Sequence, residues 1–196
     1  MKFFLIISAI GLTSLTFAAC NNNTKTSAGN GGKDTASSVA TASFDKNSGS
    51  KPTEAVKGLV ASYLQLKNSL AADNSSQAAM AGAALAEGFD KFDKSALTNA
   101  QKKSFQDIAD DAKEMAEHIG KSADKLPHQR EHFDMLSKDM YDLVKLLGAG
   151  QPLYVDRCPM YNDKKGAIWL SEVKEIKNPY LGSKMPDCGS IEETLK

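Results

Sequence analysis

Two cysteines near the C-terminus each have a methionine within three residues, and these four sulfur atoms are the first set of side chains that suggests chemistry. One pair is Cys158 with Met160, and the other is Met185 with Cys188. Thiolates and thioethers are soft ligands, which prefer Cu(I) to hard cations such as Mg²⁺ or Ca²⁺. The pattern predicts a soft-metal site formed by Cys158, Met160, Met185 and Cys188, with Cu(I) as the expected ion.

The same cysteines allow a second interpretation, which the sequence leaves open. The chain has three cysteines, and if Cys20 is modified at the N-terminus, Cys158 and Cys188 remain as an even pair in an oxidising compartment. A disulfide closing a loop of 30 residues would stabilise the fold by roughly 3 to 4 kcal/mol. Methionines also commonly fill gaps in a core. The alternative function is therefore a non-metal interaction module with a structural Cys158–Cys188 disulfide.

Histidines supply the next group of ligands. His128 and His132 are one helical turn apart, and the apolar stripe that continues beyond His132 turns it towards the protein interior. We expect His132 to join the sulfur ligands, since the tail can fold back onto this helix. His128 is equally compatible with a solvated position, and His118 with a contact to carbonyls at a helix end. The H-x-x-E-H pattern also occurs in zinc proteases, but the chain lacks a suitable distal Glu and is too short for a peptide cleft. We expect no enzyme.

The helices that would carry these histidines are predicted by apolar residues at helical spacing between residues 52 and 150. They span roughly residues 53–72, 76–92, 98–120 and 127–147. The sequence predicts a mainly α fold, an antiparallel four-helix bundle. In residues 151–196 the periodicity is lost, and two short apolar runs around a turn-rich stretch predict a small β-hairpin in an irregular tail. We expect the tail to form one domain with the helices.

The first residues predict a location. Residues 1–19 have a positive start, a short apolar run and small residues before Cys20, as in the lipobox of bacterial lipoproteins. Lipidation of Cys20 would anchor the chain to a membrane. Residues 20–51 are polar and form the expected disordered tether. We expect a protein of the cell envelope, anchored in the outer membrane and facing the periplasm.

The overall charge and the missing motifs argue against nucleic-acid-binding and nucleotide-binding proteins. Lysine plus arginine number 24, as do aspartate plus glutamate, so the formal net charge is +0. No positive field exists to attract nucleic acid. The phosphate-binding glycine patterns are missing from the sequence as well, and we expect no organic cofactor.

The tail motif and one helix resemble a known family. The motif comprises Cys158 to Met160, Gly166 to Ser171 and Asn178 to Gly189, and the helix carries Gln129 to Phe133. Together they resemble the Bacteroidetes exported "domain of unknown function 3347", over about residues 52–190. Members occur as small lipoproteins and as appendages of membrane-fusion subunits of heavy-metal efflux systems. The resemblance implies copper handling, by buffering or by transfer to an efflux membrane-fusion protein.

Overall fold

The structure is a computed structural model that describes residues 50–196, with side chains from Ala55 onward. These residues belong to one compact unit. The predicted signal peptide, the lipidation site at Cys20 and the predicted tether up to residue 49 lie outside the described residues. Among the helices of residues 50–196, none combines the length and apolar character needed to cross a bilayer.

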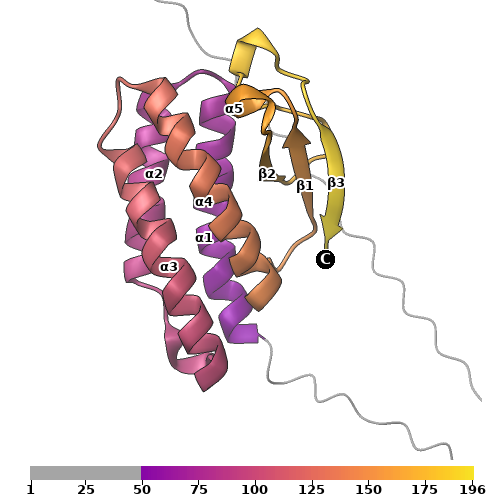
Figure 1. The fold of residues 1–196 in the computed structure, drawn as a ribbon. Coiled ribbons are helices and arrows are strands. Elements are labelled where there is room, and N and C mark those ends of the chain that lie inside the picture. Colours follow the sequence, from indigo (N-terminus) through magenta and orange to yellow (C-terminus); the bar gives the residue numbers. More distant parts are fainter. Residues whose placement is uncertain (1–49) are drawn as a thin grey trace, which may run out of the picture. The chain divides into compact units, whose positions relative to one another are not determined.

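Most of the described chain is helical, as predicted. The long helices are α1 (Ser50–Ala71), α2 (Ser75–Asp90), α3 (Asn99–Gly120) and α4 (Leu126–Leu147), with the short η1 (Lys94–Ala96) before α3. Consecutive long helices pack against each other, and α4 also packs against α1 (Figure 1). Each helix lies within about three residues of its predicted range.

Local sequence explains where these helices begin. The Asn74 side chain accepts a hydrogen bond from the Gln77 N–H at the start of α2. Thr98 and Gln101 form a reciprocal capping box at the start of α3. Pro127 lies in the first turn of α4, where a missing N–H costs nothing. The link between α3 and α4 is only five residues long, so the end of α3 lies beside the start of α4.

The tail contains a sheet of three strands, whereas the sequence predicted a two-stranded hairpin. The strands are β1 (Leu153–Cys158), β2 (Ala167–Ser171) and β3 (Ser190–Leu195), in the antiparallel order β2-β1-β3. The prediction missed β3 because its residues are mostly polar and exposed. β3 forms its backbone hydrogen bonds with the edge of β1 that β2 leaves free. A local sequence pattern does not predict such a pairing.

The turn between β1 and β2 contains the short α5 (Tyr161–Lys164) and uses left-handed backbone angles. Asn162 and Asp163 have φ of 51° and 53°, Lys164 has φ of 66° and Gly166 has φ of 79°. Asn, Asp and Gly tolerate this region best. The turn-rich stretch was therefore predicted in the right place. A second short turn, η2 (Gly182–Lys184), follows β2.

The sheet packs against α4 and α1, on one side of the helices (Figure 1). Tyr63 of α1 is fully buried there, and its hydroxyl lies 2.8 Å from Ser137 Oγ and accepts a hydrogen bond from the Leu170 N–H. Tyr180 donates a hydrogen bond to the Ile168 carbonyl. Helices and tail therefore share one core, as the aromatic contacts Tyr63–Phe133 and Phe133–Tyr180 also indicate.

Candidate metal centre

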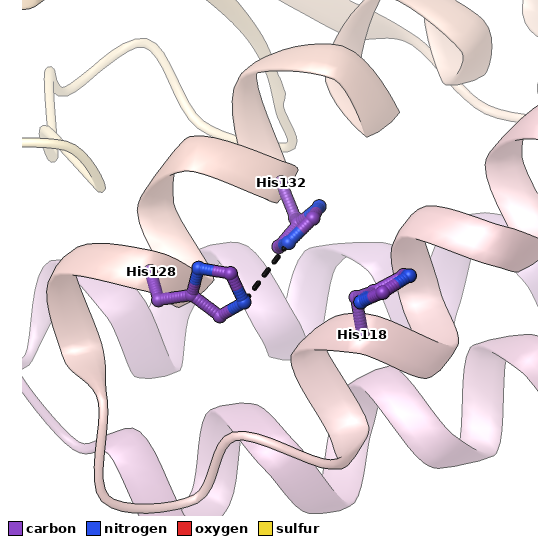
Figure 2. A group of neighbouring side chains, drawn as sticks. All are labelled: His118, His128 and His132. Atoms are coloured by element: carbon purple, nitrogen blue, oxygen red, sulfur yellow. Dashed lines mark hydrogen bonds between the residues drawn. The ribbon is translucent and has the colours of Figure 1, made fainter.

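Three histidines from two helices gather at the junction of α3 and α4. His118 lies in the last turn of α3, and His128 and His132 lie in the first two turns of α4 (Figure 2). One ring nitrogen from each residue lies within 4.8 Å of the others. The spacing of four residues places His128 and His132 on one face of α4, and the short link brings His118 to that face.

The distances between the ring nitrogens suit one metal ion. His132 Nε2 lies 3.1 Å from His128 Nε2. Two nitrogens that each lie about 2.0–2.1 Å from one tetrahedral ion are about 3.3 Å apart. The His118 ring stacks on the His132 ring with centroids 4.6 Å apart. Because these two rings are nearly parallel, His118 would have to turn before its nitrogen could face the same ion as His132.

Met115 fixes the orientation of the His132 ring. Its sulfur lies 3.3 Å from His132 Nδ1, on the other edge of the ring from the contact with His128. A thioether sulfur has no hydrogen to donate and accepts only weakly, so this contact is favourable when Nδ1 carries the proton. The lone pair is then on Nε2, directed towards His128. If an ion is bound here, Met115 would orient the ligand His132, as outer-shell residues do in metal sites.

The surroundings keep His132 in the form that binds metals. Partial burial, followed by the nearby His128 and His118, lowers the pKa of His132 below its usual value. Metal ligation requires neutral imidazole. Each of the other two histidines has a carboxylate close to a ring nitrogen: Glu131 lies 3.5 Å from His128 Nδ1 and Glu114 lies 3.8 Å from His118 Nε2. Neither contact is a hydrogen bond, but both carboxylates are close enough to attract a ring N–H electrostatically.

The centre is open to solvent on one side. The side chain of His118 is 49% exposed and that of His128 is 44% exposed, whereas His132 is more enclosed by both helices. Three protein ligands leave a fourth position of a tetrahedral ion for water or an external ligand. An ion held here is accessible for exchange.

The structure also brings the two predicted cysteines together. Cys158 Sγ lies 2.9 Å from Cys188 Sγ, and both are free thiols. Cys158 is fully buried at the end of β1, and Cys188 is half-buried. The hydrogen bond to Cys158, with a smaller contribution from burial, raises the pKa of the Cys188 thiol to about 11. A backbone N–H from Met160 opposes this shift.

No hydrogen bond of residues 55–196 joins a methionine sulfur or His132 to these thiols. Met160 and Met185 are 47% and 41% exposed. His132 contacts Met115, His118 and His128, all on α3 or α4. Arg130 and Ser137, which are two turns apart on the other side of α4, face the tail instead. Among the contacts of residues 55–196, none joins His132 to either thiol.

The sequence analysis selected His132 as a candidate ligand but did not group it with His118, His128 and Met115. His118 was considered compatible with a carbonyl contact, and His128 with a solvated position. The sequence does contain a signal for this group. All three histidines of the chain lie within 15 residues, at the predicted end of one helix and the predicted start of the next.

A comparison with protein families matches this part of the chain. The model of DUF3347, described as a protein of unknown function, matches residues 59–151. The resemblance to this family that the sequence suggested is confirmed for residues 59–151. No curated protein and no solved structure matches it. The matched segment contains the three histidines and Met115, whereas Cys158 and Cys188 lie beyond its end.

Proposed function

We propose that this protein binds one transition-metal ion, copper in preference to other metals, through His118, His128 and His132. The observation that supports the proposal is the convergence of three imidazoles, with one nitrogen of each within 4.8 Å of the others. Binding without turnover is proposed, for buffering or for transfer to a heavy-metal efflux partner. The antiparallel four-helix bundle is proposed as the frame of the site.

Copper is the preferred ion because of the donor atoms. Imidazole suits Zn, Cu, Fe and Ni, and among divalent first-row metals Cu²⁺ binds most tightly to a given nitrogen site. Three neutral imidazoles also suit the softer Cu(I). No carboxylate belongs to the three-histidine group, which argues against Mg²⁺ and Ca²⁺. The exposed edge of the site supports exchange of the ion with a partner. Envelope location through lipidated Cys20 remains part of the proposal.

The test is a titration of the reduced protein with Cu(I) under anaerobic conditions against a competing chelator, repeated with Cu²⁺ and Zn²⁺. We expect one copper ion per chain. Replacing two of the ligands (His118→Gln, His132→Gln) should weaken copper binding by at least about 100-fold, because loss of an outer-shell partner alone costs 10–100-fold.

The matched control is Cys158→Ser with Cys188→Ser, which removes both tail thiols and keeps the histidines. This variant should bind copper as the parent chain does. If copper binding survives the histidine changes but is lost in the thiol variant, the metal site is formed by the tail sulfurs and not by the histidines. Binding that no variant affects, or that is too weak to compete with the chelator, would contradict a metal function and favour the interaction module.

A further inference from the structure

Cys158 and Cys188 are held in contact by two well-fixed parts of the chain. Cys158 is the last residue of β1 and pairs with Ala167 of β2. Cys188 lies between η2 and β3, and its carbonyl accepts a hydrogen bond of 2.7 Å from the side chain of Asn178, which is fully buried. The 2.9 Å contact between the sulfurs is thus a property of the folded sheet and its adjoining loop.

Gly189 shows how closely this loop approaches β1. It has φ of 152°, and a Cβ added to it would lie 3.0 Å from the Arg157 carbonyl oxygen and 2.9 Å from the Trp169 ring. Only glycine fits against the strand at this point. Gly189, the residue after Cys188, therefore lets the loop pack closely against the end of β1, and this packing keeps the two thiols in contact.

The spacing of the sulfurs fits a covalent bond better than a shared metal ion. A disulfide has a sulfur–sulfur bond of about 2.05 Å, so the two sulfurs need to approach by roughly 0.9 Å. Two thiolates that each lie about 2.3 Å from one tetrahedral ion are roughly 3.8 Å apart. Metal binding would have to separate the thiols, and it would have to do so at a sulfur that is fully buried.

We propose that Cys158 and Cys188 form a redox-active dithiol that external organic disulfides oxidise to an intramolecular disulfide. Cys188 reacts first because it is the accessible thiol. Its thiolate attacks the external disulfide, forms a mixed disulfide and releases one thiolate. Cys158 then loses its proton and attacks Cys188 Sγ, which releases the second thiolate. Two protein thiols are oxidised, and one external disulfide is reduced to two thiols.

The bond would join β1 covalently to the loop before β3. It would close a loop over about 30 residues, which includes β2 and the turn around α5. The oxidised form should be more resistant to unfolding, since a crosslink restricts the unfolded chain. This inference is independent of the proposed copper site, because no histidine takes part.

The test uses the full chain, reduced and then treated with oxidised glutathione at about pH 8.5 in the presence of a metal chelator. Free thiols are blocked with N-ethylmaleimide, and tryptic peptides are analysed by mass spectrometry. Trypsin places the two cysteines in separate peptides, residues 158–164 and 185–196. We expect these peptides to be linked, with a mass two hydrogens lower than their sum, and the apparent melting temperature to rise by roughly 5 °C or more.

Two single variants separate the steps. In Cys158→Ser, Cys188 should retain glutathione as a stable mixed disulfide. In Cys188→Ser, the buried Cys158 should remain unmodified, and the melting temperature should not respond to the oxidant. The proposal is wrong if the parent chain accumulates glutathione on Cys188 without a link, if the link forms to Cys20, or if both thiols stay free until the protein is denatured. The His118→Gln, His132→Gln chain should form the same link, which keeps this test separate from the copper titration.

Discussion

At the scale of single residues, the two nitrogens of His132 have different surroundings, and this difference decides what the ring can bind. Nδ1 faces the Met115 sulfur at 3.3 Å, and Nε2 faces His128 at 3.1 Å. A ring without the sulfur contact would be free to turn over, which exchanges the two nitrogens. The thioether therefore preorganises one lone pair for the proposed ion.

Replacing Met115 with leucine tests this role. Leucine has a similar volume and fills the same space, so the change should affect stability little. It removes the acceptor for Nδ1–H, and copper affinity should fall by about 10-fold. The measurement is the chelator competition described above. Met80→Leu is the matched control, because Met80 lies on α2 and is 73% exposed; equal affinities for both variants would show that the Met115 sulfur does not orient the ring.

A second residue whose environment matters is Asp156 of β1. It is fully buried, and neither carboxylate oxygen has a hydrogen bond of good geometry among the described residues. Burial raises its pKa from 3.8 to about 6, a shift that Lys67 and the nearby Trp169 side chain reduce and Glu172 increases. The folded state therefore binds this proton more tightly than the unfolded state does. The resulting stabilisation is complete below about pH 4 and is lost as the pH rises through 6.

Asp156→Asn should remove this dependence. The neutral amide has the same shape and no charge to desolvate, so the free energy of unfolding should increase by about 1 to 2 kcal/mol at pH 8 and hardly change at pH 4. Urea unfolding of the parent chain and the variant at pH 4 and pH 8 measures the change in the free energy of unfolding at each pH. The exposed Asp107→Asn serves as the control for loss of a negative charge. A variant that is destabilised equally at both pH values would mean that ionised Asp156 is needed as a partner of Lys67.

At the scale of the elements, α2 and α3 approach each other closely at a glycine. A Cβ added to Gly82 would lie 2.9 Å from Ile119 Cγ2 and 3.0 Å from the Ala116 carbonyl oxygen, and part of that neighbouring surface is backbone that cannot move aside. Ile119 and Ala116 flank the proposed ligand His118 on α3. The packing of α2 thus fixes the helix that carries part of the site.

Gly82→Ala should consequently destabilise the protein by roughly 1 to 3 kcal/mol, because the added methyl group forces the helices apart. Gly58→Ala is the matched control on α1. Nothing lies within 4 Å of a Cβ at Gly58, so the better helix propensity of alanine should stabilise by about 0.5 to 1 kcal/mol. Denaturant unfolding of both variants measures the difference. If both changes have the same sign, close packing at Gly82 is not the controlling factor.

The sequence predicted these helices well because their determinants are local. The caps Asn74 and Thr98, the proline of α4 and the apolar spacing all act within a few residues. The third strand was not predictable in this way. β3 has one buried residue, Leu195, and is fixed by pairing with β1 more than 30 residues away along the chain. Its existence depends on a tertiary contact that no local pattern contains.

At the scale of the whole molecule, α4 separates His132 from the two cysteines, which the sequence predicted to form one site. One face of the helix carries His128 and His132 towards α3, and another carries Arg130 and Ser137 towards the tail. Sequence periodicity gives the relative directions of these side chains, but not which neighbour each direction meets. For that reason the sequence could suggest that the two cysteines meet, whereas it could not show that His132 lies beside Met115 and His118.

Arg130 is the residue that joins the tail to the helices. Its guanidinium donates hydrogen bonds to the carbonyls of Pro179 and Leu70, at 2.7 and 2.9 Å, and pairs with Asp73. Asp73 in turn accepts from the Ser183 N–H, and these contacts lower its pKa to about 2. One planar side chain thus binds the end of α1, the following turn and the loop that leads to Cys188. A lysine has one ammonium group and cannot make these contacts together.

Arg130→Lys should therefore destabilise the protein by roughly 1.5 to 3 kcal/mol, since it leaves partly buried acceptors without a donor. The loss should also speed amide hydrogen exchange in residues 178–184 more than in α3. The chain's other arginine provides the control: Arg157 is 40% exposed and donates to one carbonyl, that of Lys165, so Arg157→Lys should cost less than about 1 kcal/mol. If the two variants were equally stable, or if exchange rose uniformly, the tail would be held by its aromatic core around Tyr180 and not by the arginine.

Because the same loop positions Cys188, a strongly destabilising Arg130→Lys should also slow formation of the proposed disulfide while leaving copper binding intact.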